Sequence, residues 1–127
     1  MFGLFSSTKS YDNLDASAFA EAMKKSDTVV LDVRTRAEFN SGHIPGAKYI
    51  DVSSRDFYSK AQSLDPNKHY LVYCRSGMRS ADACRQLSKM KFEKLSNLRG
   101  GVMQWRGKLK QPWKLQRKKK ERRSARS

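Results

Sequence analysis

Hydrophobic positions along the chain form short runs that alternate with segments of helical spacing. Runs of β-branched, aromatic and aliphatic residues predict strands at Thr28–Leu31, Ala47–Ile50, His69–Tyr73 and Phe92–Leu98. Spacing and start signals predict helices at Asp15–Lys25 and Thr35–Gly42, a third from Ser53 or Ser54 to Ser63, a fourth from Arg79 or Ser80 to Lys89, and a short one after Gly100-Gly101. Strands alternating with helices are typical of an α/β fold, with a mostly parallel sheet flanked by helices on both faces.

Two of these helices begin with distinct capping signals. Asp15 precedes an apolar helical pattern, and a carboxylate at this position accepts a backbone N–H of the first turn. Thr35 and Glu38 have the spacing of a capping box, in which each side chain bonds the other residue's backbone. These signals fix the starts of two helices more firmly than hydrophobic spacing alone.

The 127 residues are sufficient for one ordinary domain and leave a polar appendage. From residue 114 onward the only clearly apolar residues are Leu115 and Ala125, too few for a core. We expect an N-terminal extension at 1–10, a domain at 11–112 and a basic, disordered C-terminal tail at 113–127.

The net charge of +15 is concentrated near the C-terminus. From Trp105 onward, eleven Lys or Arg and one acid give +10, while the other residues, with 16 bases and 11 acids, give +5. A basic tail favours attraction to nucleic acid, an anionic membrane surface or an acidic protein. Two interpretations stay open: a merely solvated terminus, or a tether that binds nucleic acid without sequence preference.

Two cysteines ten positions apart, Cys74 and Cys84, make a poor disulfide framework. The N-terminal residues lack a signal-peptide pattern, and the longest apolar stretch is far too short to span a membrane. We therefore expect reduced thiols in a cytoplasmic, monomeric protein.

Cys74 directly follows the clearest predicted strand and begins a loop that leads into a helix. This geometry lets backbone N–H groups converge near the sulfur, at the positive end of the helix dipole, and lower the thiol pKa. Gly77 permits the tight turn, and Arg75 and Arg79 add charge for an anionic substrate. The predicted active-site loop comprises Arg75, Ser76, Gly77, Met78, Arg79 and Ser80. The structural alternative is that Cys74 is a small apolar residue filling space at a strand end.

These segments, taken in order, resemble the rhodanese family of sulfurtransferases over roughly residues 11–112. The resemblance rests on Leu31-Asp32-Val33-Arg34, Glu38-Phe39, Gly42-His43-Ile44-Pro45-Gly46-Ala47, Cys74 to Ser80, Asn97 to Gly101, and Trp105. It implies a five-stranded parallel sheet flanked by helices, and a Cys74 persulfide that takes sulfane sulfur from a donor such as thiosulfate and passes it to an acceptor. Phosphatases of the same superfamily have a loop one residue longer, which argues against phosphate as the substrate here.

Two functions fit these residues. The first is a thiosulfate or persulfide sulfurtransferase with small-molecule donor and acceptor, and the second is a persulfide carrier or binding module that works with protein partners. A third hypothesis makes the domain an adaptor for nucleic acid through its tail. The sequence predicts neither a metal nor a cofactor at the site.

Other residues have supporting roles. Asp32 and Arg34 are predicted to brace the loop, with Asp32 available to pair with Arg79 or Arg75; a plain capping or ion-pair role is equally compatible. His43 is expected to organise hydrogen bonds, and Cys84 to be a buried structural thiol. One departure from the family is Lys91, which stands where a glycine usually precedes an aromatic residue.

Overall fold

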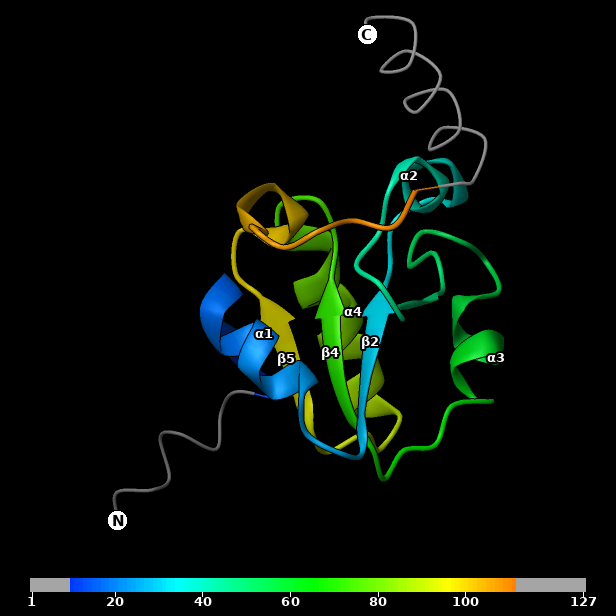
Figure 1. The fold of residues 1–127 in the computed structure, drawn as a ribbon. Coiled ribbons are helices and arrows are strands. Elements are labelled where there is room, and N and C mark those ends of the chain that lie inside the picture. Colours follow the sequence, from blue (N-terminus) through cyan, green and yellow to red (C-terminus); the bar gives the residue numbers. More distant parts are fainter. Residues whose placement is uncertain (1–9, 112–127) are drawn as a thin grey trace, which may run out of the picture.

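The structure, a computed structural model, describes residues 10–111 (Figure 1). The tail expected at 113–127 and residues 1–9 of the N-terminal extension lie outside these residues. The strands are β1 (Asp12–Leu14), β2 (Thr28–Asp32), β3 (Lys48–Tyr49), β4 (His69–Tyr73) and β5 (Leu95–Leu98). The helices are α1 (Ala16–Met23), α2 (Arg36–Ser41), α3 (Phe57–Ala61), α4 (Met78–Lys89) and the 3-10 helix η3 (Gly101–Gln104).

The five strands form one sheet in the order β1-β5-β4-β2-β3. Every neighbouring pair is parallel, so the mostly parallel α/β sheet expected from the sequence is confirmed and is parallel throughout. All five strands therefore end at the same edge, which is uppermost in Figure 1. In such sheets this edge is where ligands bind.

Helices cover both faces of the sheet, as predicted (Figure 1). Along β4, Leu71 and Tyr73 belong to one apolar cluster with Phe19 of α1, whereas Tyr70 and Val72 belong to a second with Leu87 of α4. The period-two alternation of a strand produces this division, because successive side chains point to opposite faces. The continuous run of apolar residues in β4 is thus explained by burial on both sides.

The capping signals are confirmed at both helix starts. The Asp15 carboxylate accepts the Ala18 N–H at 2.8 Å, and Thr35 and Glu38 form the complete capping box. The helix expected from Ser53 is shorter and begins at Phe57, because Ser53 is held in a turn by the Asp51 carboxylate.

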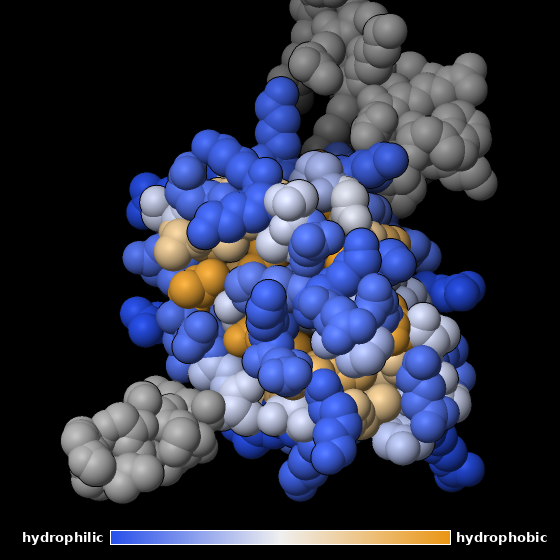
Figure 2. Space-filling model, turned by 90° about the horizontal axis from the view of Figure 1, so that it is seen from below, coloured by the Kyte–Doolittle hydropathy of each residue, from blue (hydrophilic) through white to orange (hydrophobic). Residues whose placement is uncertain are grey.

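The face at the N-terminal ends of the strands is mainly hydrophilic, with small apolar patches between charged side chains (Figure 2). Among residues 10–111, no helix is long and apolar enough to cross a membrane.

Lys91 has the left-handed backbone that its position implies, with φ of 76°. Helix α4 ends in a Schellman arrangement, in which the Phe92 N–H bonds the Leu87 carbonyl and the Lys91 N–H bonds that of Ser88. The side chain of Lys91 is exposed, so only its backbone conformation opposes this geometry. A non-glycine residue here costs free energy because its Cβ crowds the following carbonyl.

We predict that Lys91→Gly stabilises the domain by about 0.5 to 1 kcal/mol, after allowing for the greater entropy of glycine in the unfolded chain. Thermal unfolding should show a melting temperature higher by a few degrees. Lys89→Gly, a control inside the last turn of α4, should lower it. A loss of stability in both variants would contradict this account of Lys91.

Candidate active site

Cys74 is the residue that follows β4, and its side chain is fully buried. The chain turns through Arg75, Ser76 and Gly77 and enters α4 at Met78. The sulfur therefore lies between the carboxyl end of the central strand and the amino end of a twelve-residue helix. Both positions were expected from the sequence.

Three donors converge on the sulfur. The Gly77 N–H lies 3.1 Å from Cys74 Sγ, and the Ser80 N–H and Ser80 hydroxyl each lie 3.3 Å from it. We call these three donors the thiolate cradle. The predicted convergence of N–H groups is thus confirmed, and the positive end of the α4 dipole lies behind them. The role of Cys74 as a nucleophile stays a prediction.

The thiolate cradle and burial have opposite effects on the pKa of Cys74. Burial is the largest single influence and raises the thiol pKa, because a low-dielectric interior disfavours the anion. The hydrogen bonds from Ser80, Gly77 and Ser76 together outweigh burial and leave the pKa of Cys74 below its usual value. Cys84 gives the contrast: without such donors, burial raises its pKa to about 12. Cys84 is fully buried, as expected of a structural thiol.

Two glycines allow the loop to close around the sulfur. Gly77 has φ of 102°, and a Cβ there would lie 3.2 Å from the Gly100 nitrogen. Gly101 has φ of 65°, and a Cβ there would overlap the carbonyl of Arg75. This close approach lets the η3 backbone bond the loop: the Val102 N–H donates to the Cys74 carbonyl at 2.9 Å. The requirement for glycine at position 101 was not predicted from the sequence.

Asn97, on β5, bonds two residues of the loop, Gly77 and Ser80. Its Oδ1 accepts the Ser80 hydroxyl at 2.5 Å, and its Nδ2 donates to the Gly77 carbonyl at 3.2 Å and to Asn13 Oδ1 at 3.0 Å. The amide is therefore fixed in one orientation. Asn97 was quoted for the family resemblance but not proposed as a site residue; a polar residue in a buried strand was the available signal.

Of the two roles considered for Asp32, pairing with Arg79 or Arg75 in support of the loop is not found. Arg79 instead forms two parallel hydrogen bonds with Glu38, at 2.8 and 2.9 Å. This pairing and the Thr35 hydrogen bonds lower the pKa of Glu38 to about 2. Arg79 is thus committed to a carboxylate. Glu38 belongs to the loop environment, whereas the sequence placed it in the capping box and in the segments of the family resemblance but did not propose it as a site residue.

Asp32 pairs with Arg34, two residues along the chain, at 2.7 Å, and both side chains are buried. Arg34 also donates to the Gly42 carbonyl at 2.7 Å and lies over the Tyr73 ring. The Asp32–Arg34 pair therefore holds the chain at Gly42. Of the two roles considered for Asp32, the plain ion pair fits these contacts.

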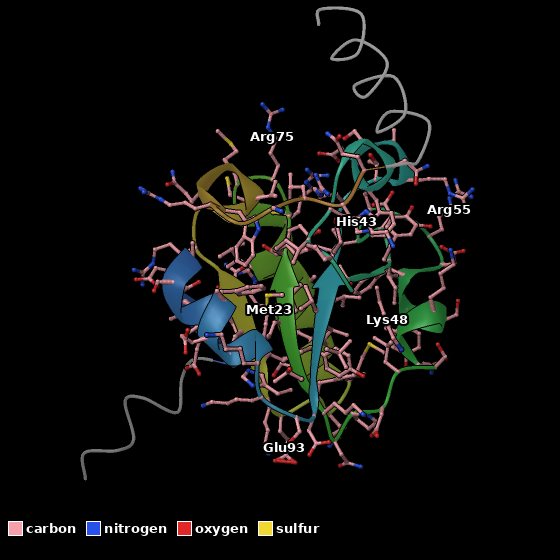
Figure 3. The ribbon with its side chains drawn as sticks, in the orientation of Figure 1. Met23, His43, Lys48, Arg55, Arg75 and Glu93 are labelled. Atoms are coloured by element: carbon pink, nitrogen blue, oxygen red, sulfur yellow. The ribbon has the colours of Figure 1, made fainter. Side chains whose placement is uncertain are left out.

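The remaining loop side chains lie at the surface. Met78 is 78% exposed, and Arg75 points away from the body of the domain (Figure 3). His43 organises hydrogen bonds as predicted: Nδ1 lies 3.0 Å from the Phe39 carbonyl, and the two rings stack. No group of three or more His, Cys, Asp or Glu residues within 10–111 is placed to hold a metal.

A parallel α/β sheet with a buried, hydrogen-bonded cysteine between strand and helix defines a class of thiol-containing domains. The chain belongs to one family within that class, the rhodanese-like domain, which matches residues 15–108. The resemblance stated from the sequence is therefore confirmed.

Individual relatives agree with this membership. The chain is 37% identical over 98 residues to the Bacillus subtilis protein named "Putative sulfurtransferase YtwF", covering 76% of this chain and 92% of that protein. It is 34% identical over 94 residues to a Bacillus cereus tRNA uridine(34) hydroxylase, covering 71% of this chain but only 30% of the hydroxylase. A rhodanese-related protein from Thermoplasma volcanium superimposes with a TM-score of 0.66 at 32% identity, covering 75% of this chain and 90% of that one.

We predict that Ser80→Ala raises the pKa of Cys74, because a hydrogen bond to the charged sulfur is lost. Titration of thiolate absorbance at 240 nm measures this shift, since Cys84 ionises only at much higher pH. Ser88→Ala, further along α4, should leave the titration unchanged. An unchanged midpoint in Ser80→Ala would show that its hydroxyl does not stabilise the thiolate.

Proposed function

We propose that this rhodanese-like domain is a sulfurtransferase that carries sulfur as a persulfide on Cys74. The observation that supports the proposal best is the convergence of the thiolate cradle on Sγ. Donors fixed around the sulfur stabilise an anion there without a general base, which suits a thiolate and equally a persulfide anion. The family membership and the relative named as a sulfurtransferase support the same chemistry.

The proposed reaction has two displacements. The Cys74 thiolate attacks the outer sulfur of thiosulfate, an S–S bond forms to Sγ, and the original S–S bond breaks with its electron pair leaving on sulfite. An acceptor such as cyanide then attacks the outer persulfide sulfur and departs as thiocyanate. The electron pair of the broken bond returns to Sγ, so the thiolate is regenerated with no net oxidation or reduction of the protein.

An anionic donor meets the exposed side of the loop first. No described residue forms an ion pair with Arg75, whereas the charge of Arg79 is balanced by Glu38. Arg75 is therefore the loop cation that attracts the donor. Because Cys74 has no exposed surface, reaction also requires a local opening of the loop, in which Arg75, Ser76 and Met78 have exposed side chains.

A persulfide carrier that exchanges sulfur with protein partners is the second candidate. It uses the same cradle and the same first displacement, but protein thiols replace cyanide as acceptors. Steady-state turnover of thiosulfate and cyanide distinguishes the two: an enzyme releases many equivalents of thiocyanate per protein molecule, whereas a carrier turns over weakly and releases about one.

We predict that thiosulfate increases the mass of the protein by about 32 Da, one sulfur atom, and that cyanide reverses the change. Intact-protein mass spectrometry measures both steps. Cys74→Ser should abolish the addition, whereas Cys84→Ala, which replaces the buried second thiol, should retain it. Sulfur that still adds to Cys74→Ser would exclude Cys74 as the carrier.

We also propose that the basic tail binds nucleic acid through its charge. The +10 carried from Trp105 onward supports this, because a polycation displaces counterions from phosphates and binds with little sequence preference. The tail is separate in sequence from the Cys74 loop, so nucleic-acid binding and sulfur chemistry are expected to vary independently.

We predict that replacing Lys118, Lys119 and Lys120 by Gln weakens oligonucleotide binding and reduces the slope of log K against log salt by about two, less than the limit for three lost phosphate contacts. Fluorescence anisotropy at several salt concentrations measures this. The matched control replaces the exposed Lys25, Lys89 and Lys94 of the body. Equal effects of the two triple substitutions would contradict binding by the tail.

A further inference from the structure

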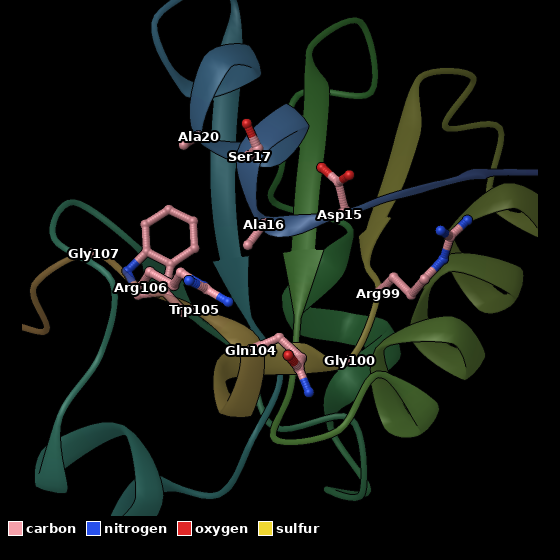
Figure 4. A pocket seen from close by; sticks show the side chains of 10 residues that line it. All are labelled: Asp15, Ala16, Ser17, Ala20, Arg99, Gly100, Gln104, Trp105, Arg106 and Gly107. Atoms are coloured by element: carbon pink, nitrogen blue, oxygen red, sulfur yellow. The ribbon is translucent and has the colours of Figure 1, made fainter.

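A cavity of about 710 Å³ lies outside the Cys74 loop (Figure 4). It opens between α1 and the segment from Arg99 to Gly107 that follows β5, and none of the loop residues 74–80 lines it. Its volume is within the range of about 300–1,000 Å³ typical of pockets for small molecules. We call it the Trp105 pocket.

Its apolar surface is formed by Trp105 together with Ala16 and Ala20 of α1. The indole is held in place by an edge-to-face contact with Phe19, with ring centroids 6.0 Å apart. A rigid aromatic side chain beside small residues leaves room for a flat ring to stack. Among the side chains of residues 10–111, the indole Nε1 of Trp105 is the one buried nitrogen or oxygen that has no hydrogen-bond partner.

That unpaired donor lies against the backbone of Gly107, which is itself a lining residue of the pocket. Because this N–H is buried against the backbone, a ligand in the pocket meets other parts of the half-buried indole. The pocket therefore suits a planar group that stacks on the open part of the ring.

The charges at the opening favour an anion. Arg99 and Arg106 both line the pocket and are exposed. Asp15 is the one acidic residue that lines the pocket, and its carboxylate already accepts a hydrogen bond from the first turn of α1. From Gly107 the chain continues directly into Lys108, Lys110 and the rest of the +10 segment.

We propose that the Trp105 pocket binds one unpaired base of a single-stranded nucleic acid. The base stacks on Trp105, and flanking phosphates bind Arg99 and Arg106. Proteins commonly hold an unstacked base against an aromatic ring, while basic side chains bind the phosphates of the nucleic acid. An acidic peptide would use the arginines but leave the indole face without a stacking partner.

This inference deepens the proposed attachment of nucleic acid through the tail and does not depend on sulfur transfer. It also places the bound nucleic acid beside the Cys74 loop. Gln104 and Gly100 line the pocket, and the η3 residues between them donate backbone hydrogen bonds to the carbonyls of Cys74 and Arg75.

The test compares two labelled probes, a ten-nucleotide oligothymidine and an abasic strand of the same length and charge. The full chain should bind the oligothymidine about tenfold more tightly, because stacking adds to the phosphate contacts. An oligouridine arm establishes whether RNA behaves alike. Equal affinity for normal and abasic strands would mean that only charge binds, and absence of binding to both would overturn the proposal together with that for the tail.

Variants locate the base. Trp105→Leu should remove the preference for the normal strand, while Trp105→Phe should retain most of it. Arg99→Gln should weaken both probes several-fold and leave thiocyanate production unchanged, whereas Arg85→Gln, an equal loss of charge on α4, should have little effect. If Trp105→Leu fails to fold, photocrosslinking of an oligonucleotide containing 5-iodouridine to the unmodified protein decides: attachment at Trp105 is expected, and attachment confined to the tail would overturn the pocket.

Discussion

The fold around the Cys74 loop depends on keeping a buried sulfur surrounded by hydrogen-bond donors. Burial alone raises a thiol pKa, as Cys84 shows with a value of about 12, only ten residues from Cys74. The N–H groups that reverse this effect at Cys74 have to point inward from a single turn of chain. This requires the left-handed backbone of Gly77 and the start of α4 immediately after it. The parallel strand β4 supplies the fixed end from which that turn begins.

Ser80 couples this turn to the rest of the sheet. Its hydroxyl has one hydrogen and two acceptors within reach, Cys74 Sγ at 3.3 Å and Asn97 Oδ1 at 2.5 Å. When Cys74 is a neutral thiol, the hydroxyl donates to Asn97 and accepts from the S–H. When Cys74 is a thiolate, the hydroxyl gains more by donating to the charged sulfur, because hydrogen bonds to ions are the stronger ones. Ionisation of the sulfur therefore changes the hydrogen bonding of Asn97, which also holds Gly77 and the edge strand β1.

The sequence predicted most of this framework but not the contacts between distant segments. The His69–Tyr73 strand has the bounds predicted, because a run of apolar residues buried on both faces leaves little ambiguity. β1 was not predicted, since its Asp12-Asn13-Leu14 has no apolar period and pairs along one edge only with β5. Arg79 and Glu38 are 41 positions apart, and local reasoning placed them in different motifs. Nothing in the local pattern distinguished Glu38 from Asp32 as the partner of Arg79.

Backbone groups and side chains have different roles at this site. Backbone N–H groups stabilise the sulfur, whereas side chains are proposed to select the ligand. Two of the three donors to Sγ are backbone N–H groups, so most substitutions around the loop leave them in place. The exposed side chains proposed to meet a ligand first, Arg75, Met78, Arg99 and Arg106, can change at little cost to the fold. A domain built in this way retains the proposed sulfur chemistry when these surface side chains differ. The specificity of the proposed ligand site is therefore to be sought on η3 and the segment after it, where the backbone bonds the Cys74 loop and the side chains line the pocket.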